Sequence, residues 1–158
     1  MAYYDDLLDS ARKLLGNARG RPRYSDCNRA VSTAYYSVFD FICRQCAIRV
    51  CGPLPMGQRP SDDWVRVYRS LDHAQVGSIL IAIAGPKSTH PLAPLSMQFQ
   101  RLKEARLEAD YDPSVTFSKV EALALIDNAT TAIAAFNNAS RDVQTKFLVE
   151  LLVLKPKR

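Results

Sequence analysis

Apolar side chains recur at intervals of three and four residues along most of the chain, which is the spacing of helices that bury one face. The pattern is longest in a stretch that Ser25 or Asp26 can cap and that runs to about Arg49, and a second stripe, polar and aromatic, follows its opposite side. The apolar stripe comprises Cys27, Val31, Ala34, Val38, Phe41 and Ile42. The polar stripe comprises Arg29, Thr33, Tyr36, Asp40 and Cys43. This stretch predicts a central helix with the core on one side; its polar stripe is either a partly buried site or a solvated face.

The same spacing predicts further helices before and after the central one. They are expected over 3–16, in a short helix capped by Ser61, from Asp72 to about 84, over 95–109, from Ser118 to about 136, and over a last segment that carries Val143 to Leu152. No alternation typical of strands persists anywhere. The fold class is therefore all-α, a small helical bundle in which the helices at 25–49 and 95–109 are neighbours.

The chain divides into residues 1–136, which form the bundle, and residues 137–158, a last helix with a basic tail. The segment Phe147-Leu-Val-Glu-Leu-Leu-Val-Leu154 is apolar on nearly every side, more than a surface helix requires. It is expected to pack on the same domain or on a dimer partner, and a symmetric homodimer is favoured because exposed apolar patches of that size are rare on monomers.

A net charge of +5 permits an acidic partner such as RNA without demanding one. Basic residues gather in the first 30 positions and at the end of the chain, a pattern that solubility alone also explains. They are Arg12, Lys13, Arg19, Arg21, Arg23 and Arg29, then Lys155, Lys157 and Arg158. No apolar run reaches the ~20 residues that a bilayer span needs, and the N-terminus lacks a secretory pattern. A soluble, cytoplasmic protein is expected, with no membrane partner.

Cys43 and Cys46 stand two residues apart, a spacing found in zinc sites. No second ligand pair follows, and the two histidines are far downstream, so buried thiols explain these residues better than a metal. Neither a metal nor a cofactor is expected.

Arg106 occupies a position where the helical period calls for an apolar residue. An inward arginine must be paired, because an unpaired buried charge is costly. Asp40 is the favoured partner and Asp110, one turn along the same helix, is the alternative. Tyr36 and Tyr111 are expected to place hydroxyls around the pair, with His73 approaching from the start of another helix.

Three segments together resemble the HEPN-domain family, over roughly Leu7 to Phe136. Ala34-Tyr-Tyr-Ser-Val-Phe39 is similar to the family's "AYYAxFH" helix, Asp72-His73 to its short Thr/Ser-His segment, and Ala105-Arg-Leu-Glu-Ala-Asp-Tyr-Asp112 to its "LRxxADYD" motif. The resemblance implies a four- to five-helix up-and-down bundle, often a homodimer, here with an extra C-terminal helix. It also implies RNA as the target. Many members are metal-independent endoribonucleases, commonly toxins neutralised by a nucleotidyltransferase antitoxin.

Two positions depart from the active family pattern. Asp40 stands where the family helix carries histidine, and Tyr111 stands where histidine would complete the motif of Arg, four to six residues, then His. Arg66 and His73 satisfy that spacing formally but lie outside the usual helix. If the protein is active, Arg106, His73, Asp40 and Tyr111 are the catalytic candidates. Tyr36, Arg29 and Asp110 are the candidates for binding RNA or supporting the site.

The leading hypothesis is thus a HEPN-type RNA-associated protein. It is either the ribonuclease toxin of a toxin–antitoxin pair or a catalytically degenerate relative that binds RNA or a nucleotide. The alternative is a non-catalytic interaction module that forms homo- or hetero-oligomers without nucleic acid. A cysteine-ligated metal protein is a third, weaker hypothesis.

Overall fold

The computed structural model describes residues 3–16, 21–55, 57–85 and 88–153. Within these ranges every regular element is a helix, so the all-α prediction is confirmed. The helices are α1 (Tyr3–Gly16), α2 (Tyr24–Cys51), α3 (Asp62–Tyr68), α4 (His73–Ala84), α5 (Ala93–Tyr111), α6 (Lys119–Asn138) and α7 (Arg141–Val153). None of the described helices is both long enough and apolar enough to cross a bilayer.

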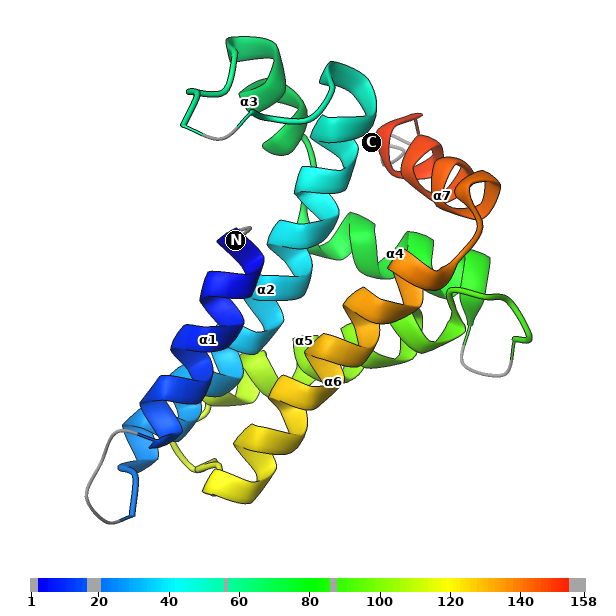
Figure 1. Cartoon of the computed structure of the whole chain (residues 1–158). Coiled ribbons are helices and arrows are strands. Elements are labelled where there is room, and N and C mark those ends of the chain that lie inside the picture. The colour runs from blue at the N-terminus through cyan, green and yellow to red at the C-terminus, as the bar shows by residue number, and fades with distance from the viewer. Residues whose placement is uncertain (1–2, 17–20, 56, 86–87, 154–158) are drawn as a thin grey trace.

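α2 is the helix against which most of the others pack (Figure 1). It packs against α1, α5, α6, α3 and α7, and α5 also packs against α6 and α4. The predicted contact between the helices at 25–49 and 95–109 is confirmed as the α2–α5 interface. The predicted apolar stripe of α2 is buried throughout, from Cys27 to Ile42.

Helix starts follow from side-chain caps that the sequence displays. Ser61, Asp72 and Ser118 each accept a hydrogen bond from the backbone N–H three residues later, as a polar side chain does at an N-cap. The predicted start of α2 at Ser25 or Asp26 is wrong. The helix begins at Tyr24, and the Asp26 carboxylate accepts a hydrogen bond from the backbone N–H of Arg23 at 3.3 Å.

α7 packs on its own chain. Phe147, Leu148 and Leu151 are buried in the common core, and Gln75 Nε2 at the start of α4 donates to the carbonyl of Leu151 at 2.9 Å. Val149 and Val153 are exposed on the other side of the helix. The chain itself therefore covers the most apolar face, and the homodimer stays a prediction. Residue 154 and the basic tail that follows it lie outside the described residues, as does Arg19.

Candidate functional site at the α2–α5 face

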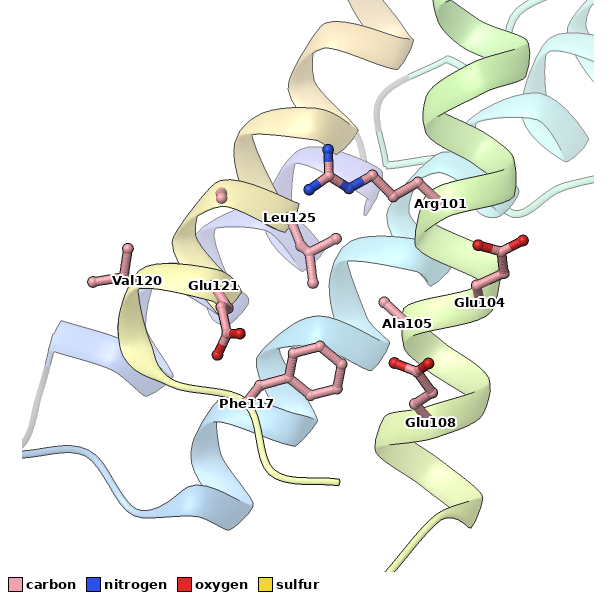
Figure 2. A pocket seen from close by; sticks show the side chains of 9 residues that line it. Arg101, Glu104, Ala105, Glu108, Phe117, Val120, Glu121 and Leu125 are labelled. Carbon is pink, nitrogen blue, oxygen red and sulfur yellow. The ribbon is translucent and has the colours of Figure 1, made fainter. Parts of the chain in front are cut away.

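Three of the hollows on the described part of the surface need to be distinguished. One, of about 340 Å³, lies between α5 and α6 and carries Glu104, Glu108 and Glu121 around Phe117 (Figure 2). None of the predicted site residues lines it. Its three carboxylates outnumber the single arginine there, Arg101, so this hollow would repel a nucleic acid.

Arg106 projects from α5 into a cage of tyrosines on the α2 side. Its Nη2 donates to Tyr36 Oη at 2.6 Å and lies 3.5 Å from Tyr111 Oη. The guanidinium carbon is 5.3 Å from the centroid of the Tyr36 ring and 5.2 Å from that of Tyr111, within the range of cation–π attraction. The side chain is only 16 % exposed, so the predicted inward position is confirmed.

The carboxylate beside Arg106 is Asp110, with Oδ2 2.9 Å from Nε. This contact is an ion pair without hydrogen-bond alignment, because Nε makes no well-directed hydrogen bond. Burial lowers the pKa of Arg106, but the hydrogen bond to Tyr36 and the nearby phenols and Asp110 together raise the pKa above its ordinary value. The guanidinium is therefore a permanent cation.

The favoured pairing of Asp40 with Arg106 is wrong. Asp40 is buried on α2 and its two oxygens are already bound: Oδ2 accepts from Arg44 Nε at 2.7 Å and Oδ1 accepts from Tyr68 at 2.6 Å. Asp40 and Arg44 are four residues apart on α2, and Arg106 and Asp110 are four residues apart on α5. Such pairs form within one helix and need no contact between helices. Each charge is thus satisfied locally, and the alternative assignment of Asp110 is the one observed.

The Arg106 pocket is a hollow of about 550 Å³ around this guanidinium. Four of the predicted site residues meet there with Arg106, namely Arg29, Tyr36, Asp110 and Tyr111. Its remaining lining was not predicted: Ser25, Asn28, Ser32 and Ala109. Ser25, Asn28 and Ser32 recur at helical spacing with Arg29 and Tyr36, and this spacing is the signal that could have found them.

Two of the unpredicted residues fix the geometry of the Arg106 pocket. Ser32 Oγ donates to Asp110 Oδ2 at 3.1 Å, which ties the acidic side of the pocket to α2. Asn28 donates to the carbonyl of Ala109 at 3.3 Å and accepts from the backbone N–H of Phe117 at 3.1 Å. The end of α5 and the segment after it are thereby held against the first turns of α2.

His73 lies on the other side of Tyr36, in a separate hollow of about 410 Å³ that we name the His73 pocket. Tyr3, Leu7, Thr33, Tyr36, Phe39, Asp40, Tyr68 and His73 line it. Tyr36 is common to both pockets. Arg66, the formal alternative partner of His73, is exposed on α3 and lines neither pocket.

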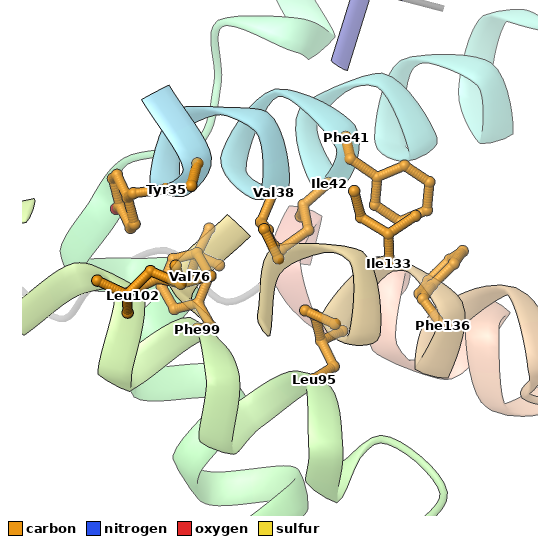
Figure 3. Packing of buried hydrophobic residues seen from close by; sticks show 14 of the residues in the cluster. Tyr35, Val38, Phe41, Ile42, Val76, Leu95, Phe99, Leu102, Ile133 and Phe136 are labelled. Carbon is orange, nitrogen blue, oxygen red and sulfur yellow. The ribbon is translucent and has the colours of Figure 1, made fainter. Parts of the chain in front are cut away.

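The imidazole of His73 is held by aromatic neighbours. Its Nδ1 shares a hydrogen bond of 2.7 Å with Tyr35 Oη, and its ring centroid lies 3.9 Å from that of Phe39. Figure 3 shows Tyr35 in the core beside Val76, Phe99 and Leu102. Burial, helped by the positive charge of Arg106, lowers the pKa of His73, and burial raises the pKa of Tyr35. At pH 7 the imidazole is therefore neutral and the phenol keeps its proton.

Three of the four cysteines face the core. Cys27, Cys43 and Cys46 are buried and Cys51 is exposed. Burial raises the pKa of Cys43 to about 12, with the charges of Cys46 and Asp40 adding to the effect, and burial alone raises that of Cys46 to about 12. Over the described part of the chain, no three side chains of histidine, cysteine, aspartate or glutamate are grouped to hold a metal ion.

We expect only Cys51 to react rapidly with an aromatic disulfide reagent at pH 8, because the thiolate is the reactive form and the other thiols are buried. Cys27, Cys43 and Cys46 should react only after the protein is unfolded in denaturant. Rapid reaction of more than one thiol in the native protein would contradict this prediction. Stoichiometric zinc that survives dialysis would contradict the expected absence of a metal.

Comparison of the chain with protein-family models, with curated proteins and with solved structures found no significant match. The HEPN resemblance therefore stays a prediction carried by the three segments named above.

Proposed function

We propose that this protein binds single-stranded RNA at the Arg106 pocket, as a HEPN-type RNA-associated protein that does not cleave its ligand. The observation that carries the proposal is the set of groups around one guanidinium. Arg106 is oriented by Tyr36, Tyr111 offers an open aromatic face, and Arg29 adds a second cation on the rim. A cation for phosphate and an exposed ring for a base are the two elements with which proteins hold single strands.

Arg106 keeps donors for a phosphate despite its protein contacts. A guanidinium carries five N–H donors, and the described contacts use only Nε and Nη2. Asp110 offsets part of the positive charge of Arg106. Ser32 Oγ donates to the same oxygen of Asp110, so this carboxylate does not depend on Arg106 alone for a partner. The planar fork is then available for a bidentate contact with phosphate oxygens.

The surroundings of the Arg106 pocket favour an extended anionic ligand. Arg21, Arg23 and Arg29 are exposed at and just before the first turns of α2, whose N-terminal end also carries partial positive charge. Tyr111 is 70 % exposed, so much of its ring is accessible to a ligand. A strand that crosses the pocket would thus meet basic side chains on one side and a stacking surface on the other.

We favour binding over cleavage because His73 lies away from Arg106. Attack of a 2′-hydroxyl on the adjacent phosphate needs a base, an acid and a cation around one phosphate. His73 lines a different pocket from Arg106, and its Nδ1 is engaged by Tyr35. Asp40 is occupied by Arg44 and Tyr68 and has no oxygen to spare for orienting either residue. The homodimer and the nucleotidyltransferase partner stay predictions.

We expect the purified full chain to bind a fluorescently labelled single-stranded RNA in an anisotropy titration. With about three phosphates neutralised, the logarithm of the affinity should fall with the logarithm of salt concentration with a slope of about −2. The RNA should remain intact on a gel after incubation with or without chelator. Cleavage that resists chelator would favour the ribonuclease instead, and absence of binding at low salt would favour the interaction module without nucleic acid.

A further inference from the structure

The His73 pocket contains a concentration of aromatic rings that RNA binding at Arg106 does not explain. Tyr3, Tyr36, Phe39 and Tyr68 form its walls, and His73 and Thr33 supply polar groups. Its volume of about 410 Å³ lies in the range of ligand sites, which are typically apolar hollows with a few polar groups that orient the ligand. The pocket therefore has the size and composition of a site for one small, planar molecule.

The charges around this pocket argue against a cationic ligand. Aromatic rings with a carboxylate often hold an ammonium group, but here the cation is already present. The Arg44 guanidinium pairs with Asp40 at 2.7 Å and lies 5.3 Å from the Tyr3 ring centroid and 5.8 Å from that of Tyr68. A second cation would meet this charge at close range, so a neutral ligand fits the pocket better.

The polar groups of the pocket suit a ring that carries both donors and acceptors. Within the described residues, Tyr35 engages His73 Nδ1, whereas Nε2 makes no hydrogen bond. Tyr36 Oη accepts from Arg106 and retains its own proton to donate. A purine or pyrimidine would pair its edge with these atoms while its faces stack on the aromatic walls.

The two pockets are joined through one side chain. Tyr36 lines both, with the Arg106 guanidinium 5.3 Å from its ring centroid and the His73 ring centroid 5.9 Å away. A nucleotide whose phosphate meets Arg106 can thus reach the other pocket with its base. We infer that the His73 pocket receives one unstacked nucleobase of the bound RNA, which rests on the proposed function because the same strand must occupy the Arg106 pocket.

The inference is tested with adenosine as the probe and ribose as the ligand that lacks a base. Calorimetric or NMR titration of the full chain should show binding of adenosine and none of ribose. Thr33→Phe would place a ring inside the pocket, and we expect it to weaken adenosine affinity by about tenfold or more, the scale of one base–aromatic stack. It should weaken RNA binding in the same direction.

Thr131→Phe is the matched control. Both threonines lie on helices and donate Oγ1 to the carbonyl four residues earlier, Thr33 to Arg29 at 2.7 Å and Thr131 to Asp127 at 3.0 Å. Thr131 is exposed on α6 and lines neither pocket. This variant should keep adenosine affinity within about twofold of the native protein, since no stacking surface is altered.

Tyr3→Ala is a second variant in case Thr33→Phe does not fold. Tyr3 is exposed at the start of α1, so its loss should remove one wall without disturbing the core, and adenosine affinity should fall about threefold. No adenosine binding to the native protein would overturn the inference, as would unchanged affinity in the folded variants. RNA binding without adenosine binding would overturn this inference and leave the proposed function standing. Adenosine binding without RNA binding would overturn the proposed function, and with it the assignment of the base to a bound RNA strand.

Discussion

Replacing Asp40 with alanine should lower the free energy of unfolding by about 3 kcal/mol, the cost of leaving a buried charge without its partner. The Asp40 side chain is 5 % exposed and that of Arg44 is 24 % exposed, so water can replace the lost carboxylate only in part. Tyr68 would also lose the acceptor for its hydroxyl. For a chain of this length the melting temperature should fall by roughly 6–12 °C. Urea or thermal denaturation measures both quantities.

Asp142→Ala is the control that separates the effect of burial from the effect of losing an ion pair. Asp142 and Lys146 form a pair with the same four-residue spacing at 2.9 Å, but their side chains are 73 % and 76 % exposed. Its loss should change stability by less than about 0.5 kcal/mol. Asp40→Asn should fall between the two at about 1–2 kcal/mol, because its amide oxygen still accepts a hydrogen bond. Equal effects of Asp40→Ala and Asp142→Ala would refute a buried network.

Replacing Arg106 with lysine should weaken RNA binding by about 10- to 100-fold while stability changes by less than about 1 kcal/mol. Lysine keeps a positive charge near Asp110, so the ion pair survives. Lysine lacks the planar guanidinium of arginine. That group can donate two N–H groups to a phosphate while a third N–H donates to Tyr36. Anisotropy titration and denaturation of the same preparation measure the two effects.

Arg101→Lys makes the same change at an exposed position on the same helix, beside the acidic α5–α6 hollow. It should leave RNA affinity within about threefold, because the positive charge is kept and Arg101 lies outside the Arg106 pocket. A purely structural role for Arg106 gives a different result, in which Arg106→Lys and Arg106→Ala lower stability and RNA affinity stays unchanged. Arg106→Ala itself should cost about 1 kcal/mol, since Asp110 is 27 % exposed and keeps its bond from Ser32.

Helix positions were predictable because the information for them is local. Three-and-four spacing marks the buried faces, and Ser61, Asp72 and Ser118 cap helices close to where the sequence places them. The start of α2 was missed because Asp26 is itself a good capping residue. In the fold Asp26 is the third residue of a helix that begins at Tyr24, and its carboxylate accepts a hydrogen bond from the backbone N–H of Arg23.

The lining of the Arg106 pocket was predictable in part, and so were the ion pairs around it. The helical period predicts that Arg106 points inward. The contact of α2 with α5 then brings it to its tyrosine neighbours. The partners of Asp40 were predictable only in part, because Arg44 and Tyr68 are available to it as well as Arg106. The four-residue spacing on α2 indicates Arg44 as one partner, but the second partner, Tyr68, depends on the position of α3, which brings its hydroxyl to 2.6 Å from Asp40 Oδ1. No periodicity along one helix encodes that position.

The many contacts of α2 limit which of its residues can be substituted. An element that touches α1, α3, α5, α6 and α7 has few positions that can change size without displacing a neighbour. Tyr36 and Asp40 are carried on this element, so their side chains are oriented before any ligand arrives and little conformational freedom remains to be lost on binding. Substitutions that retune affinity should therefore be tolerated at exposed rim positions such as Arg29 and Tyr111, while the middle of α2 stays nearly fixed.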